Sequence, residues 1–478
     1  MNIMNRIIGF LILIFMFLSV NACDGVLDAD VRSSITGQTF WEDQGDFEPY
    51  LVGIYARYRS HIDFMGFGED RSEMWRQGRN ARFTPAWSHT LTSGNTVQWT
   101  AHYGTIGHIN LLLDRIDGFE FTVPDDKNRI IAEAHAMRAA MYFFLARVWG
   151  DVPLALEPVE DQHAPLLAQS PVEEIFQQIN SDIQIALDTF PQDGFTNRYR
   201  WTKPAVYALL ADVKMWSATV LNGGEPDFLD AIDAISQIEN HNTMLLEDFR
   251  EIFESSANQE IIFSFYLDRA EYSSGQYNFA LPRQDTAGGA DNAAELPIAL
   301  VGQDGYTLSE EALEIINAYP DDNRIPVTYI AEISGGEIAY YWPNKFIGTQ
   351  YPDTRVADSD IILYRLADML LLKAEAYAAI GQPENALEYL NRVRERAGVP
   401  DYQETDQLSL QREILDERGR ELFHEIKRWY DLRRAHAMGV IDVYEHVPNL
   451  RGQSTPLYWP VHTAMLSRNE RLVQTAGY

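Results

Sequence analysis

The chain has 478 residues, of which 46% are hydrophobic and 23% are charged, a composition typical of a folded globular protein. Its 70 Asp and Glu outnumber its 38 Lys and Arg, so the formal net charge is −32. This charge disfavours nucleic acid and anionic membrane surfaces as partners, because like charges repel. A single cysteine excludes a disulfide framework and a metal site built on cysteines.

The N-terminal 22 residues have the pattern of a signal peptide. An apolar run from Ile7 to Val20 is too short to span a bilayer comfortably, but its length suits a signal-peptide core. The run is followed by the small residue Ala22 and by the only cysteine, Cys23, an arrangement that resembles a bacterial lipobox. We therefore expect cleavage before Cys23 and acylation of this residue, and several acyl chains would anchor the protein stably. An incidental cysteine in a cleaved or buried segment is the alternative.

Amphipathic helices are predicted along most of the chain, after a polar, glycine-containing tether over residues 24–45. The turns at 223–226 and 381–383 each place Gly before Pro, which is typical of a helix end followed by a helix start. These turns predict antiparallel helix pairs, whose alanine-rich interiors are similar to tetratricopeptide units. The predicted helices begin near residue 46 and include 129–149, 171–190, 204–221, 228–239, 360–380, 383–397 and 408–437.

Residues 240–360 have little helical periodicity and are rich in Gly, Pro, Tyr and Asp. This pattern predicts loops, a short strand over 260–266 and a short helix over 309–318. The expected fold class is therefore all-α, with a tetratricopeptide-like helical-pair scaffold and an irregular, loop-rich ligand-binding lobe. The expected organisation is a signal peptide (1–22), a lipidated tether and entry segment (23–45), an N-terminal helical region (46–239) and a C-terminal region (240–478) that contains the loop-rich insert (240–360) and the C-terminal helices (361–478).

The chain shows no recognisable catalytic or cofactor motif. The glycines Gly66 and Gly68 lack the third glycine of a dinucleotide fingerprint. The pair His424 and Glu425 lacks the second histidine of a zinc-protease motif. We therefore expect no catalytic residue, no metal site and no cofactor.

Ordered motifs over most of the chain resemble the SusD/RagB-like family of outer-membrane nutrient-binding lipoproteins of Bacteroidota. The departures are His462, where the family more often has Pro, and Asn469, which Glu470 follows in place of Pro. The motifs that carry the resemblance are Trp99-x-x-x-Tyr103-x-x-Ile106 with Asn110, Trp149-Gly150-Asp151-Val152-Pro153-Leu154, Tyr364-Arg365-Leu366-Ala367-Asp368, Leu390-Asn391-x-Val393-Arg394-x-Arg396-Ala397-Gly398, Arg428-Trp429-x-Asp431-Leu432-Arg433 and the closing Gly477-Tyr478.

The resemblance implies a tetratricopeptide scaffold, a lipid anchor in the outer membrane and a surface-exposed location. It also implies capture of an oligosaccharide or polysaccharide and delivery to a partner SusC-like TonB-dependent transporter. Two alternatives stay open. Some family members capture peptides, and a helical glycan-degrading enzyme is a possibility from another class of function.

Two loop stretches, 69–95 and 266–292, combine aromatic with polar residues and are the predicted ligand site. Pyranose rings stack on Trp and Tyr, while Asn and Arg bond hydroxyl groups. The alternative is that these rings pack inside the lobe, as we expect for Trp99 and Tyr103 in the scaffold. A second candidate is the cluster 340–342. The predicted ligand-binding residues are Trp75, Arg79, Trp87, Tyr272, Tyr277 and Asn278.

Overall fold

The computed structural model describes residues 40–80, 84–159 and 165–478. Residues Phe47–Tyr478 form one compact unit, and the segment that ends at Asp46 forms another. The described part of that segment contains the short 3-10 helix η1 (Gln44–Asp46). Cys23 and the predicted signal peptide lie outside the described residues, so lipidation stays a prediction. No helix among the described residues is both long and apolar enough to cross a membrane.

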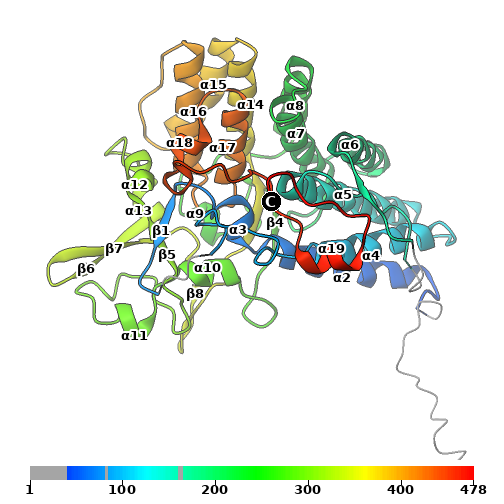
Figure 1. The fold of residues 1–478 in the computed structure, drawn as a ribbon, viewed down its shortest axis with the longest axis horizontal. Helices are drawn as coiled ribbons and strands as arrows, with labels where there is room; N and C mark the ends of the chain where they lie inside the picture. The colour runs from blue at the N-terminus through cyan, green and yellow to red at the C-terminus, as the bar shows by residue number, and fades with distance from the viewer. Residues whose placement is uncertain (1–39, 81–83, 160–164) are drawn as a thin grey trace, which may run out of the picture. The chain divides into compact units, whose positions relative to one another are not determined.

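Helices dominate residues 47–239, and successive helices pack in pairs, α5 on α6 and α7 on α8 (Figure 1). The predicted helices over 129–149, 171–190, 204–221 and 228–239 are confirmed. Pro lies in the first turn of α5, α7 and α8, where its missing N–H costs no helical hydrogen bond. The helices are α2 (Phe47–Ile62), α3 (Met65–Gly68), α4 (Thr100–Ile116), α5 (Pro124–Trp149), α6 (Val172–Thr189), α7 (Lys203–Thr219) and α8 (Glu225–Glu239).

Short helices and two-stranded antiparallel sheets make up residues 240–365, where the early strand at 75–77 joins a later strand, while the strands at 152–153 and 169–170 of the first half of the chain pair with each other. The predicted strand over 260–266 and helix over 309–318 are confirmed. The helices are α9 (Glu251–Glu254), α10 (Gly275–Ala280), α11 (Gln284–Ala287), α12 (Glu310–Ile316) and α13 (Ile325–Thr328). The sheets pair β1 (Trp75–Gln77) with β5 (Tyr306–Leu308), β2 (Val152–Pro153) with β3 (Gln169–Ser170), β4 (Ile261–Phe265) with β10 (Ile361–Arg365), β6 (Tyr329–Ser334) with β7 (Glu337–Pro343), and β8 (Thr349–Gln350) with β9 (Arg355–Val356).

The C-terminal helices complete the scaffold, and α14 packs against α7, α8, α15 and α16. The predicted turn between α14 and α15 is confirmed, with Gly381 at φ 71°, a conformation that costs glycine little. Buried leucine and alanine side chains of α14, α15 and α16 form one hydrophobic cluster. The helices are α14 (Leu366–Ala379), α15 (Pro383–Arg396), α16 (Gln407–Glu421), α17 (Arg428–Ala437), α18 (Val443–His446), η2 (Pro448–Leu450) and α19 (Thr463–Arg468).

Two predicted helices differ from the structure. The helix predicted over 360–380 begins with strand β10, because the β-branched Ile361 and Ile362 are buried in a ladder with β4. The helix predicted over 408–437 is interrupted between α16 and α17, where His424 and Ile426 have φ values of 65° and 60°. The backbone of Gly68 lies against the Ile426 carbonyl so closely that a side chain there would clash with it. This contact from a distant part of the chain accompanies the break.

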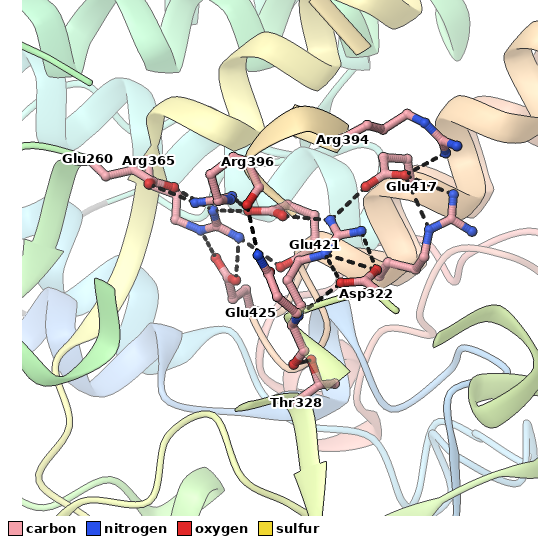
Figure 2. A network of polar contacts seen from close by, with 12 residues as sticks. Glu260, Asp322, Thr328, Arg365, Arg394, Arg396, Glu417, Glu421 and Glu425 are labelled. Atoms are coloured by element: carbon pink, nitrogen blue, oxygen red, sulfur yellow. Dashed lines mark hydrogen bonds and ion pairs between the residues drawn. The ribbon is translucent and has the colours of Figure 1, made fainter. Parts of the chain in front are cut away.

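Buried ion pairs connect the scaffold helices with the loop-rich region (Figure 2). The Arg365 guanidinium, on β10, donates hydrogen bonds to Glu260 at 2.8 Å, to Glu421 at 2.5 Å and to Glu425 at 2.8 Å. All four side chains are at most 1% exposed. Arg324, which precedes α13, also donates to Glu421, at 2.8 Å. Because each buried charge has partners of opposite sign, the network holds β4, β10 and the end of α16 in one arrangement.

Candidate functional site

The two predicted stretches converge on the buried carboxylate of Asp304. Asn80 Nδ2 donates to Asp304 Oδ2 at 3.2 Å, and the Arg283 amide donates to Oδ1 at 2.7 Å. The close approach of the first stretch to the backbone of Asp304 depends on Gly78, since a Cβ atom there would lie 2.2 Å from the Asp304 carbonyl oxygen. The Gly78 amide instead donates to the Gly305 carbonyl at 2.9 Å. The first stretch is thereby attached to the loop that leads into β5.

Arg79 is held by acidic side chains of the same lobe. Its guanidinium forms an ion pair with Glu332 of β6 and lies 3.9 Å from Asp304. It also lies 4.6 Å from the ring centroid of Tyr340 on β7, a cation–π arrangement. Since 23% of the Arg79 side chain is exposed, its main contacts are within the protein. The Tyr340 ring stacks on Trp342, at 5.2 Å.

For Trp75 and Tyr277, two of the predicted ligand-binding residues, the structure favours the alternative that the rings pack inside the lobe. Each is only 2% exposed. Trp75 packs on Phe423 with ring centroids 4.8 Å apart, and Tyr277 stacks on Phe346 at 4.4 Å. The two rings are nevertheless brought near each other, because both contact the His424 ring, at 5.0 and 5.3 Å. The stretches therefore meet in the hydrophobic interior, where their rings bury area against protein neighbours.

The imidazole at this junction is neutral. His424 is 1% exposed, and burial lowers its pKa to about 3. Its backbone amide donates to Glu69 Oε1 at 3.1 Å, and burial raises the pKa of that carboxyl to about 7. The two shifts have one physical cause, since a low-dielectric environment disfavours the charged form of both groups. The junction is thus an apolar core with two ionisable groups, and it is closed to a ligand.

Trp87 lies at the surface of the same region and lines a cleft of about 180 Å³. Its indole Nε1 donates to the Trp75 carbonyl at 2.9 Å, and its own carbonyl accepts from Asn449 Nδ2 at 3.0 Å. The first bond orients the half-buried indole ring, and the second holds the backbone that carries it. Arg76, exposed on β1 beside the buried Trp75, and Glu310 of α12 also line the cleft. Trp75 also lines the cleft, although it is only 2% exposed. The cleft thus combines the more open Trp87 ring with charged and amide groups.

Tyr272 and Asn278 have contacts outside the Trp87 cleft. The Tyr272 hydroxyl donates to Asp63 Oδ2 at 2.9 Å, and the Arg59 guanidinium lies 4.7 Å from the Tyr272 ring centroid. Desolvation, followed by the charge of Asp63, raises the pKa of the Tyr272 hydroxyl. Asn278 Nδ2 donates to the Val301 carbonyl at 2.9 Å. Neither residue lines the cleft beside Trp87.

Sequence reasoning missed Asn449 and Glu310 as part of this cleft. Alternation along β1 is a signal for Arg76, because a buried Trp75 places the next side chain outward. No sequence signal identifies Asn449, which reaches the Trp87 carbonyl from 362 residues away. Within the described ranges, no group of three or more His, Cys, Asp or Glu side chains could hold a metal ion.

Two family models match the chain. Residues 317–478 match a model described as the SusD family, and residues 55–215 match a model described as starch-binding and associating with the outer membrane. A SusD-like protein of Formosa agariphila is 27% identical, and the match covers 99% of both chains. A SusD-like protein of Bacteroides ovatus is 23% identical over 86% of this chain and 79% of its own length.

Solved structures have the same fold. NanU of B. fragilis superposes with a TM-score of 0.80 and 28% identity, covering 94% of this chain and 99% of its own. A structure named as a laminarin-binding SusD-like protein superposes with a TM-score of 0.74 and 21% identity, covering 91% and 100%. The predicted fold class, a helical tetratricopeptide-like scaffold with a loop-rich lobe, is confirmed.

Proposed function

The chain belongs to the SusD/RagB-like family, and we propose that it captures a nutrient oligosaccharide or polysaccharide at the bacterial surface and passes it to a SusC-like TonB-dependent transporter. The description of one family model as starch-binding and associating with the outer membrane supports this proposal. The acidic surface is compatible with this proposal, because a neutral sugar carries no charge that the protein would repel.

The observation that carries the proposal is the cleft beside Trp87. A flat indole ring, oriented by one hydrogen bond on a backbone held by a second and flanked by Arg76, Glu310 and Asn449, matches what a pyranose requires. The apolar face of the sugar stacks on the ring, and the hydroxyl groups bond to charged and amide groups. We assign ligand contact to Trp87, with Arg76 and Asn449 as hydroxyl partners. Arg79, Tyr272 and Asn278 hold loops of the lobe through protein contacts and remain candidates for contact with the far end of a longer ligand.

Binding measurements on the mature chain test the capture proposal. Calorimetric titration against soluble polysaccharides should find a ligand among them. Trp87→Ala should weaken that binding about tenfold to a hundredfold, since burying an aromatic face is worth roughly 1.5–3 kcal/mol. The matched control is Trp87→Phe, which keeps an apolar ring and should retain most of the affinity. Wild-type affinity in Trp87→Ala would place the site elsewhere.

Two further measurements separate the alternatives. Binding to oligopeptides without binding to polysaccharides would identify a peptide-capturing member of the family. Shortening of the polysaccharide during incubation would identify an enzyme. We expect no shortening, because the sequence shows no recognisable catalytic motif.

Membrane attachment is proposed through Cys23. Mass spectrometry of the N-terminal peptide should show an acylated Cys23, and Cys23→Ala should move the folded protein from the membrane fraction to the soluble fraction. Co-purification with a TonB-dependent transporter from detergent-solubilised outer membranes tests the delivery step. An intact Met1 or an unmodified Cys23 in the wild-type protein would contradict the anchor.

A further inference from the structure

Two open hollows share no lining residue with the Trp87 cleft. The first has a volume of about 470 Å³ and is lined by the end of α9, the residues that follow β4 and the β8–β9 hairpin. The second has a volume of about 610 Å³ and is lined by residues 194–199 together with 241–242, Ala257 and Gln259. Each is far larger than a water site, so each has room for part of a ligand.

The two hollows meet at a pair of tyrosines. Tyr199 lines the second hollow and Tyr266 lines the first, and their ring centroids lie 5.5 Å apart at an interplanar angle of 76°. The chain also passes directly from one hollow to the other, since Ser256 lines the first and Ala257 lines the second. The hollows are therefore neighbouring parts of one elongated surface, with an aromatic pair between them.

Tyr266 combines exposure with a fixed position. It is 44% exposed, although it directly follows the fully buried strand β4. Its carbonyl accepts a hydrogen bond from Arg59 Nη1 at 2.9 Å, and the amide of the next residue, Leu267, donates to Asp360 Oδ1 at 3.1 Å. Tyr199 is held by the same carboxylate, because its hydroxyl donates to Asp360 Oδ2 at 2.9 Å. An exposed ring on a rigid backbone offers contact area at little entropic cost.

The charges around the first hollow select against an anionic ligand. Glu254, Asp268, Asp358 and Asp360 all line it. Among its cationic lining residues, Lys345 is fully buried and bound to Glu425 at 2.9 Å. The charge of Asp268 raises the pKa of the exposed Tyr266 hydroxyl, as expected where the local potential is negative.

Arg355 is the remaining cationic residue of this lining, and its Nη1 is used within the protein. It donates to the carbonyls of Ile347 and Gly348, at 3.3 and 3.1 Å. Carboxylates therefore outnumber cations in the lining of the first hollow. Among the described residues, no carboxylate lines the second hollow, and the guanidinium of its Arg198 donates to two backbone carbonyls of the protein. A sulfated or uronic-acid chain would bring negative charge against the carboxylates of the first hollow, whereas hydroxyl groups can donate to carboxylate oxygens.

We propose that the surface centred on Tyr199 and Tyr266 is a second binding surface, distinct from the Trp87 cleft, for an extended neutral polysaccharide. Tyr266 provides the stacking face, and the hollows on either side receive the sugar units before and after the stacked one. The inference rests on the proposed function. It adds to that function a second point of contact with the glycan and the expectation that the glycan is uncharged. A long chain that engages both surfaces would bind more tightly than a short one, through effective concentration.

Calorimetric titration of the mature chain tests this surface. The probes are neutral polysaccharides (soluble starch, laminarin, mannan and xylan) and anionic ones (alginate, polygalacturonate and chondroitin sulfate). We expect the tightest ligand to be neutral. For that ligand, Tyr266→Ala should lower the affinity of the long polymer about tenfold, while Tyr266→Phe, which keeps the ring, should remain within about twofold. A short oligosaccharide of the same sugar should lose affinity in Trp87→Ala and keep it in Tyr266→Ala.

The outcomes distinguish the two proposals. Unchanged polymer affinity in Tyr266→Ala, or a tightest ligand that is anionic, would overturn the second surface while leaving glycan capture intact. A chain that binds none of the polysaccharides would overturn both. Thermal unfolding of Tyr266→Ala serves as the folding control, and its midpoint should match that of the wild type because the side chain is exposed.

Discussion

The ion-pair network around Arg365 and the rim of the Trp87 cleft are both rich in charged side chains, but they differ in exposure. Arg365 and Glu421 are fully buried, and each is bound to partners of opposite charge. Arg76 and Glu310, at the cleft, are exposed to solvent. The comparison shows that residue type alone does not indicate a ligand site in this chain. Burial and the number of protein partners decide whether a charged or aromatic group holds the fold or meets a ligand.

The largest expected effect is on the buried side of this comparison. Arg365→Ala removes the only cation among the described residues that pairs with Glu260, Glu421 and Glu425 together. The three buried carboxylates are then left to Arg396, Arg324 and Lys345. Removing one partner of a buried ion pair typically costs about 3–5 kcal/mol, and we expect a loss at the upper end, measured by denaturant unfolding. The matched control is Arg269→Ala, whose exposed pair with Asp353 should leave the unfolding midpoint unchanged. Equal midpoints for the two variants would contradict the comparison.

A pair of tryptophan variants sharpens the comparison for aromatic residues. Trp75→Ala should cost about 3–5 kcal/mol of stability, because it opens a cavity beside Phe423 and His424. Trp87→Ala should cost clearly less stability and should mainly lower glycan affinity. Unfolding midpoints and calorimetric affinities of both proteins are the measurements. Our assignment fails if the folded Trp75 variant loses affinity while the Trp87 variant keeps it.

Stability should fall on acidification, because buried histidines are neutral in the fold. Burial lowers the pKa of His102 to about 3 and that of the stacked His61 to about 4, from an unfolded value of 6.5. The unfolded chain therefore binds more protons at mildly acid pH, so this contribution is complete above pH 6.5 and is lost as the pH falls toward 4.

Unfolding midpoints at pH 7, 5.5 and 4.5 test the histidine contribution. His102→Phe keeps a ring against Phe144, on which His102 stacks at 5.0 Å, and removes one titrating group. Its midpoint should change less with pH than that of the wild type. A pH profile identical to that of the wild type would show that His102 does not contribute.

The smallest expected effect concerns Tyr272. Tyr272→Phe removes the hydrogen bond to Asp63, whose carboxylate also accepts hydrogen bonds from Ser274 Oγ and the Gly275 amide. We expect a loss of about 1 kcal/mol and an unchanged affinity for the glycan. A tenfold loss of affinity without a change in midpoint would move Tyr272 from the scaffold to the ligand site.

The sequence by itself determined the helical pairs and their turns. Apolar periodicity and the Gly-then-Pro turn at 381–383 are local signals, and α14 ends and α15 begins and ends close to where these signals indicate. The strand β4 and the helix α12 were also predictable, since each lies between turn residues in an otherwise irregular region. Such features depend on residues a few positions apart, whose interactions persist in every arrangement of the rest of the chain.

Only the tertiary structure decided which aromatic residues are exposed and where the last long helix is interrupted. Trp75 and Trp87 lie in the same stretch and both line one cleft. β5 and Phe423 nevertheless cover the first ring, which is 2% exposed, whereas the second is only half-buried. The break at His424 accompanies contacts from residues 68 and 69, and Glu69 lies 355 positions away from it. Burial is a property of what packs on a side chain from elsewhere in the chain, and a single stretch of sequence does not contain that information.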